Sequence, residues 1–190
     1  MKSGEAFLGY TKLIEYTNVF IGKYYVALLG LGVAAGTGRF FQTGGQGEIS
    51  WRVNFLLEVG VNLARLLTVL LVIGKGSIQT GIKQVVGVFR MSKQQWKVIW
   101  HNSRYNFSNN GVAILVNFIV FAIIAVLINV GLNFLFEYTS VLQWLKVHQV
   151  LKVSASKWPV LLFIKNISVI PFTLVFEILF LNWLVENKIC

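Results

Sequence analysis

One stretch, residues 55–74, constrains the fold of this chain more than any other. Its sequence is FLLEVGVNLARLLTVLLVIG, and about 20 apolar residues in a helix cross the hydrocarbon core of a bilayer. Glu58, Asn62 and Arg65 interrupt it at positions i, i+4 and i+7, so a helix places them on one polar stripe. Charged groups in a membrane helix face protein or water rather than lipid. The stretch therefore predicts a membrane-spanning helix with a polar side turned to a bundle interior.

The composition points in the same direction. Of the 190 residues, 56 % are hydrophobic and 13 % are charged, whereas soluble domains carry about 25 % charged residues. The apolar runs are continuous and do not alternate, which favours helices over membrane strands. We expect an all-α integral membrane protein with about four transmembrane helices and short amphipathic interfacial helices.

Four stretches are candidates for membrane spans. Lys23 shortens the uncharged run of the first, so whether it crosses fully is left open. The last contains Pro171, which removes a backbone donor and should kink the helix near its middle. The predicted spans are 19–36, 55–74, 112–136 and 160–185.

Amphipathic segments lie before and between these spans. Residues 1–18 form one such segment and precede a membrane domain over 19–190, and a helix over 140–153 is another. The loop 75–111 is basic and carries no acid, and Ser92 to Gln95 fit a capping box that starts a helix within it. Basic amphipathic helices with tryptophan lie in membrane interfaces, although a docking face for a partner protein has the same pattern. The residues predicted to contact anionic headgroups are Lys93, Trp96, Lys97 and Trp100.

The distribution of basic residues predicts the orientation of the chain. Lys and Arg are enriched in cytoplasmic loops, and the loop 75–111 holds six of them. With four spans, this loop and both termini lie on one side. If 19–36 does not span, the N-terminus lies outside and the rest of the topology is unchanged, because the loop dominates. We therefore expect a multi-pass protein with cytoplasmic N- and C-termini.

Small and amide side chains inside the spans predict helix packing. Gly32 and Gly36 form a small-xxx-small pair, which allows close approach of two helices. A dinucleotide-binding fingerprint is rejected, because Ala35 stands where its third glycine belongs. Asn129 and Asn133 face one way at i and i+4, and we expect them to hydrogen-bond between helices.

Charged residues of the second and fourth spans predict that these spans are neighbours. Glu58 and Lys165 lie at depths that agree within roughly 3 Å at a rise of 1.5 Å per residue, so we expect them to pair. Measured from the same ends, Arg65 and Glu177 differ by roughly 10 Å, which makes that second pair less favourable. The predicted intramembrane polar cluster is Glu58, Asn62, Arg65, Lys165, Asn166 and Glu177.

Residues that would support catalysis or metal binding are few. The chain contains no aspartate, its two histidines (His101 and His148) are isolated, and Cys190 is its single cysteine. No phosphate-binding loop motif is present. We expect no enzyme activity, no metal and no cofactor. Nucleic-acid binding is disfavoured, because the basic residues flank apolar segments and suit a membrane surface better.

Two functions remain. The first is a non-catalytic membrane subunit that acts as a scaffold or assembly component of a larger complex. The alternative is a small oligomeric transporter or channel subunit, in which Glu58, Arg65, Lys165 and Glu177 line a path for a solute or protons. The expected partners are the bilayer with its anionic headgroups, and other membrane subunits or further copies of the chain.

Overall fold

The structure is a computed structural model, and it describes residues 9–186. Over this range the chain forms α-helices joined by short turns, with no β-strand, so the predicted all-α class is confirmed. In chain order these are α1 (Lys12–Lys23), α2 (Tyr25–Gln42), α3 (Trp51–Ile73), α4 (Ile78–Phe89), α5 (Lys93–Asn109), α6 (Gly111–Tyr138), α7 (Val141–Val147), α8 (Trp158–Ile167) and α9 (Val169–Glu186).

Three helical stretches are long and apolar enough to cross a membrane. They are α3, α6 and the stretch Trp158–Val185, which comprises α8 and most of α9. The consecutive helices α1 and α2 provide a fourth if they are taken as one broken span. Much apolar surface on these helices is uncovered: in the most apolar window of α6, only 17 % of the residues are buried. Three to four helices could therefore span a membrane.

The described chain divides into two compact units. Unit 1 contains residues 9–24, 69–123 and 172–186, and unit 2 contains residues 25–68 and 124–171.

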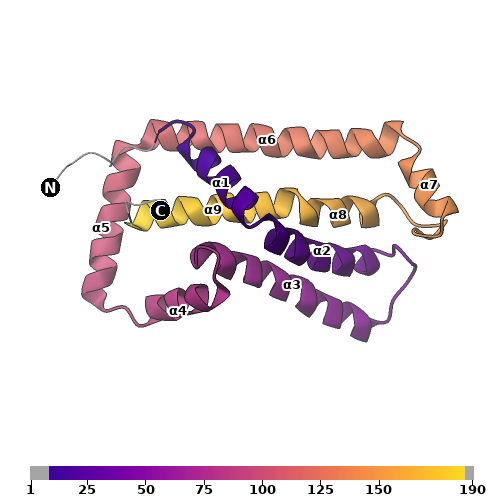
Figure 1. The fold of residues 1–190 in the computed structure, drawn as a ribbon, viewed down its shortest axis with the longest axis horizontal. Helices are drawn as coiled ribbons and strands as arrows, with labels where there is room; N and C mark the ends of the chain where they lie inside the picture. Colours follow the sequence, from indigo (N-terminus) through magenta and orange to yellow (C-terminus); the bar gives the residue numbers. More distant parts are fainter. Residues whose placement is uncertain (1–8, 187–190) are drawn as a thin grey trace. The chain divides into compact units, whose positions relative to one another are not determined.

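In unit 2, α2 lies directly against α8 (Figure 1). The two helices meet at glycines. A Cβ atom added to Gly32 would lie 2.7 Å from the carbonyl oxygen of Asn166, and one added to Gly36 would lie 2.9 Å from that of Phe163. These glycines therefore allow backbone-to-backbone contact that any larger residue would prevent.

The first predicted span, 19–36, differs from the structure at both ends. A break at Tyr24 divides it, where the hydroxyl group donates to the carbonyl oxygen of Lys75 at 2.7 Å and the ring packs on Phe20. Beyond Gly36 the helix continues to Gln42. It ends in a Schellman motif, in which the Gly45 N–H donates to the Phe40 carbonyl and Gly44 adopts a φ of +83°. The stop is therefore Gly44, whereas Gly32, Gly36 and Gly38 serve packing.

The predicted helix over 140–153 is also shorter in the structure, where α7 ends at Val147. Gln149 takes a φ of +60° and turns the chain. This turn lets Leu151, which is fully buried, enter a core cluster with Phe136, Val160 and Leu161. A hydrogen bond from the Lys152 N–H to the Gly45 carbonyl (2.8 Å) fixes the turn. Tertiary contacts thus end the helix where the local sequence would continue it.

The fourth predicted span, 160–185, is divided into α8 and α9. The break lies at Ser168, about one turn before Pro171. Proline has no N–H to donate to the carbonyl group four residues earlier, which is that of Ile167, so the helix is interrupted on the N-terminal side of Pro171.

In unit 1, α9 runs alongside the first half of α6 (Figure 1). Aromatic rings fill the contact between them. Phe121 stacks on Phe176 with ring centroids 4.4 Å apart, and Phe118 meets Phe180 edge-to-face at 5.0 Å. Such pairs stabilise beyond the apolar area that they bury.

Helix α1 also packs in unit 1, where Asn117 of α6 holds its start. The Asn117 Oδ1 accepts from the Leu13 N–H at 3.2 Å, and its Nδ2 donates to the Gly9 carbonyl at 3.2 Å. Thr11, the residue before the helix, makes no side-chain cap. A side chain distant in the sequence thus supplies the cap. Of the predicted segment 1–18, residues 1–8 lie outside the described residues, as does the tail with Cys190.

The basic segment 75–111 forms α4 and α5 in unit 1. The predicted capping box at the start of α5 is confirmed: the Ser92 Oγ accepts from the Gln95 N–H at 3.3 Å, and the Gln95 side chain accepts from the Ser92 N–H at 2.7 Å.

Candidate functional site

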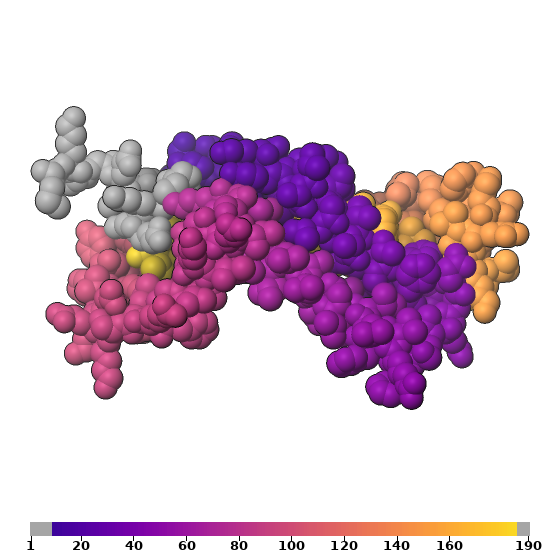
Figure 2. All heavy atoms as spheres, turned by 60° about the horizontal axis from the view of Figure 1, so that its bottom comes forward, coloured from indigo at the N-terminus to yellow at the C-terminus, as the bar shows by residue number. Residues whose placement is uncertain are grey.

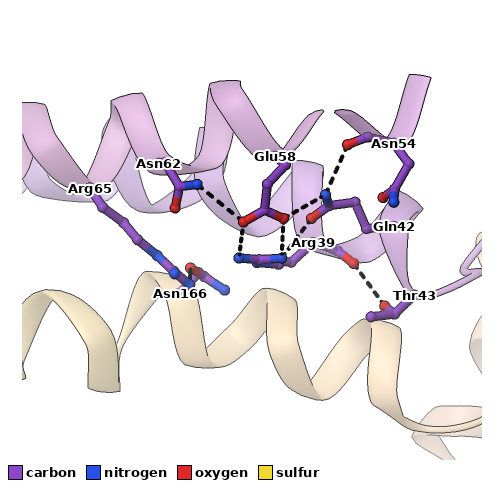
Figure 3. A network of polar contacts seen from close by, with 8 residues as sticks. All are labelled: Arg39, Gln42, Thr43, Asn54, Glu58, Asn62, Arg65 and Asn166. Carbon is purple, nitrogen blue, oxygen red and sulfur yellow. Dashed lines mark hydrogen bonds and ion pairs between the residues drawn. The ribbon is translucent and has the colours of Figure 1, made fainter. Parts of the chain in front are cut away.

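A network of polar side chains joins α2 and α3 in unit 2 (Figure 3). Its centre is the carboxylate of Glu58, which both terminal nitrogens of Arg39 bind, Nη1 at 2.7 Å and Nη2 at 3.0 Å. The planar guanidinium matches the carboxylate in this two-pronged geometry, which makes it one of the strongest protein ion pairs. The side chain of Arg39 is 24 % exposed and that of Glu58 is 42 % exposed.

Two amides complete the binding of Glu58. The Gln42 Nε2 donates to one carboxylate oxygen at 3.0 Å, and the Asn62 Nδ2 donates to the other at 3.1 Å. Gln42 also donates to the Asn54 carbonyl and accepts from Arg39. Each carboxylate oxygen therefore has two donors, and the negative charge is fully engaged.

The predicted pair of Glu58 with Lys165 is wrong, because Arg39 occupies the carboxylate. The predicted first span ends at residue 36 and leaves Arg39 in a loop, but α2 continues through Arg39 and presents it to α3. Between residues 9 and 186, Lys165 has no hydrogen-bond or ion-pair partner. The signal that could have located Arg39 is the pair Gly44 and Gly45, whose glycine-rich stop implies a helix up to Gln42.

A second contact joins α3 to α8 in the same unit. The Arg65 Nη2 donates to the Asn166 Oδ1 at 3.0 Å, and the Asn166 Nδ2 donates to the Leu162 carbonyl at 2.7 Å. Asn166 is 1 % exposed. The prediction that the second and fourth spans are neighbours is confirmed by this contact, although different residues make it.

The charge of Arg65 is not neutralised inside this network. The residue drawn next to it, Asn166, is a neutral amide, and the buried Nε of Arg65 has no hydrogen-bond partner (Figure 3). Of the eight residues drawn, Arg39 and Arg65 are cations and Glu58 alone is an anion. Since Arg39 takes both oxygens of Glu58, the network holds one cation in excess.

The remaining members of the predicted cluster and the predicted packing amides lie elsewhere. Glu177 belongs to α9 in unit 1, where it is exposed and has no ion-pair or hydrogen-bond partner among the described residues. Among residues 9–186, Asn129 and Asn133 do not bond to another helix: each donates to the carbonyl four residues earlier in α6. The bonds that the structure shows are therefore intrahelical, since an asparagine in a helix can satisfy its amide on its own backbone, and the interhelical role stays a prediction.

Two further asparagines in unit 1 are structural, and sequence reasoning gave them no partner. Asn117 holds α1, and Asn106 of α5 donates to the Leu184 carbonyl of α9 at 3.0 Å. Asn106 is the one buried residue of α5.

Helix α5 presents the predicted membrane-contact residues on an open surface. Figure 2 shows much of this helix, in pink, uncovered by the other described segments of unit 1. Lys93, Trp96, Lys97 and Trp100 are all exposed, Trp100 by 74 %. A shallow depression of about 530 Å³ on this surface is lined by Trp96, Lys97, Trp100, His101 and Arg104.

The function of the site has to be inferred from its own chemistry. Comparison with protein families, with curated proteins and with solved structures gives no match. Within residues 9–186, no three side chains of His, Cys, Asp or Glu gather as metal ligands would. What the site offers is a carboxylate held by four donors, and a guanidinium that has no counter-charge in the described part of the chain.

Proposed function

We propose that this protein is a multi-pass membrane protein and a non-catalytic subunit that organises a larger membrane assembly. The observation that carries the proposal is the engagement of Glu58. Both of its oxygens are bound by Arg39, Gln42 and Asn62, so the carboxylate serves to join α2 and α3. A group that carries protons or solutes must release its partners, and four donors oppose such release.

The uncovered apolar surface supports the membrane part of this proposal. Exposed side chains follow α6 along most of its length, at Val112, Leu115, Ile119, Ile123, Val126, Leu127, Val130 and Phe134. Soluble monomers rarely expose contiguous apolar patches of more than a few hundred Å². Lipid or another subunit would cover these residues, and the basic face of α5 would meet anionic headgroups.

A second candidate function is transport in an oligomer, and Arg65 is the observation that favours it. A cation without a counter-charge inside a span is a feature of substrate and ion paths. In that case the positive charge of Arg65 would attract an anionic solute, or the Arg65 side chain would move when a neighbouring group gains or loses a proton.

Substitution of Glu58 separates the two functions. The wild type and Glu58→Gln would be reconstituted in liposomes with a trapped pH-sensitive dye, and the same proteins would be purified from their native membrane in mild detergent. The scaffold role predicts no proton flux for either protein and a smaller, less stable complex for Glu58→Gln. Flux in the wild type that Glu58→Gln abolishes, with the complex intact, would establish transport instead.

The proposed orientation has its own test. Cytoplasmic termini predict that tags at both ends are cleaved by a protease only in inside-out vesicles. Cleavage of either tag in right-side-out vesicles would overturn the orientation.

A further inference from the structure

The uncompensated charge of Arg65 calls for an anion that the network does not supply. Its Nε is buried without a partner, and its Nη2 bonds to the neutral Asn166. An ionised group in an apolar environment is costly unless it is paired with an opposite charge. The carboxylate nearest along α3, that of Glu58, is already bound by Arg39. The counter-charge must therefore come from another residue or another molecule.

Glu177 is a carboxylate that lacks a cation, as Arg65 lacks an anion. It lies in the candidate span Trp158–Val185, is exposed on α9 and has no partner between residues 9 and 186. The other glutamates whose side chains are described differ from it: Glu15 and Glu137 pair with lysines, and Glu48 lies in the turn between α2 and α3. Among the described residues of α3 and the stretch Trp158–Val185, Glu177 is thus the acid without a partner. Lys165 is also a cation without a partner there, but of the two cations only Arg65 has a buried nitrogen that lacks a hydrogen bond.

The two residues lie at the same depth when both helices are measured from their C-terminal ends. Arg65 precedes Ile73 by eight residues, and Glu177 precedes Val185 by eight residues, so each lies about 12 Å from the end of its span. If α3, α6 and α8–α9 each cross the membrane once, α3 and α9 run in the same direction and end on the same side. These two residues have different depths in the sequence prediction because depth is counted there from the N-terminal ends of the spans, and the two spans differ in length.

We propose that two copies of this chain associate in the membrane through reciprocal ion pairs, Arg65 of each copy with Glu177 of the other. This rests on the proposed role in assembly and names its partner as a second copy. A two-fold axis along the membrane normal keeps both copies in the same orientation and therefore keeps the depths equal. Arg65 and Glu177, which have no counter-charge among residues 9–186, would each gain one, at a depth where ion pairs are screened little.

A lipid phosphate fits this position less well. Phosphates lie outside the hydrocarbon core, which is about 30 Å thick, and the bond to Asn166 holds the Arg65 side chain against α8. A carboxylate on a neighbouring helix lies at the required depth.

Charge reversal tests the pair, and mixing two variants tests whether it forms between copies. Chains of residues 1–190 would be labelled at Cys190, the single cysteine of this sequence, and association would be measured by energy transfer in liposomes of neutral lipid. Arg65→Glu alone and Glu177→Arg alone place like charges together, so the association constant of each should fall about tenfold or more.

Mixing the two variants should restore association to near the wild-type level. In a mixed pair, one contact joins the carboxylate introduced by Arg65→Glu to the guanidinium introduced by Glu177→Arg. The other contact is the wild-type pair of Arg65 and Glu177. Both contacts of the mixed pair are therefore attractive, whereas both contacts between two copies of one variant are repulsive.

Three controls make the result decisive. Lys83→Glu and Glu48→Arg reverse exposed charges outside the candidate spans and should leave association unchanged. The double variant Arg65→Glu/Glu177→Arg should associate with itself. Circular dichroism would verify that each single variant is folded. If Arg65→Glu does not fold, Arg65→Gln would replace it, and if Glu177→Arg does not fold, Glu177→Gln would replace it.

Several outcomes would overturn the inference. A monomeric wild type would overturn it, and so would single variants that still associate. Rescue in the double variant without rescue on mixing would also overturn it, because it would place the pair within one chain. If the wild type is monomeric in liposomes but Arg65→Glu removes other subunits from the native complex, self-association fails while the proposed assembly role stands.

Discussion

Arg39 binds both carboxylate oxygens of Glu58, and this pair joins the last turns of α2 to the first half of α3. A double-mutant cycle with Arg39→Gln and Glu58→Gln should show a coupling energy of about 1–3 kcal/mol, because each single change leaves a charge unpaired. The measurement is denaturation in detergent, followed by circular dichroism. Additive effects of the two changes would show that the pair does not stabilise the fold.

Replacement of Gly32 by alanine should destabilise unit 2 by about 1–3 kcal/mol, since the new Cβ atom would clash with backbone atoms of α8 that cannot move aside. Gly30 is the matched control. It lies in the same helix with open space around it, so Gly30→Ala should be neutral or stabilising by up to about 1 kcal/mol. Thermal unfolding of the two variants in one detergent compares them directly. Equal effects would mean that α2 does not pack on α8 at Gly32.

Loss of Asn117 should release α1 in particular. Asn117→Leu removes the bonds to Leu13 and Gly9 and leaves the Leu13 N–H without a partner, at a cost of about 1–3 kcal/mol, whereas the Gly9 carbonyl still accepts from the Lys12 N–H. Hydrogen exchange in residues 12–23 should therefore become faster, with little change in unit 2. Asn129→Leu is the control, because Asn129 bonds only to its own helix. Unchanged protection of α1 in Asn117→Leu would contradict the capping role.

Gln149 should be replaceable by glycine with a gain in stability. Its φ of +60° lies in the left-handed region, which costs a residue with a Cβ about 1 kcal/mol. Gln149→Gly should therefore raise the free energy of unfolding by about 0.5–1 kcal/mol. The same replacement at Val147, inside α7, should instead lower it. A loss of stability in Gln149→Gly would show that the turn after α7 has a different backbone.

The tryptophan face of α5 should lie at the membrane surface. Nitroxide labels that replace Trp96 or Trp100 in a Cys190→Ser background should report depths of about 5–10 Å below the headgroup boundary. A label at Gln94, on the opposite side of the helix, should remain in water. If the labels at all three positions are equally exposed to water in liposomes, the result would favour the alternative, in which this face docks a partner protein.

The helical architecture could be predicted from the sequence because it follows from local patterns. The uncharged run from Val112 onwards matches α6 closely, and the capping box at Ser92 starts α5 as expected. Membership of Glu58, Asn62 and Arg65 in one polar stripe is likewise a property of a single helix. These features depend on residues a few positions apart, where helical periodicity determines which side chains are neighbours.

The partners across helices could not be predicted in this way. Arg39 binds Glu58, Asn166 contacts Arg65, and Asn117 caps α1, and each of these pairs joins segments from different helices. Depth along a span is the one criterion that the sequence offers, and it favours Lys165 because the predicted first span ends before Arg39. The Gly44–Gly45 stop would have corrected the length of α2, but not the rotation of α2 about its axis.

The sequence by itself thus determined that this chain forms apolar helices with a polar stripe on α3, since hydrophobicity and helical period are local quantities. The tertiary structure alone decided which charges are satisfied. Close contact at glycines brings α2 onto α8 and Arg39 onto Glu58, so that Glu58 is neutralised and Arg65 is not. The physical reason is that a charge takes its partner from whichever helix packing brings within about 3 Å, and packing depends on the whole chain.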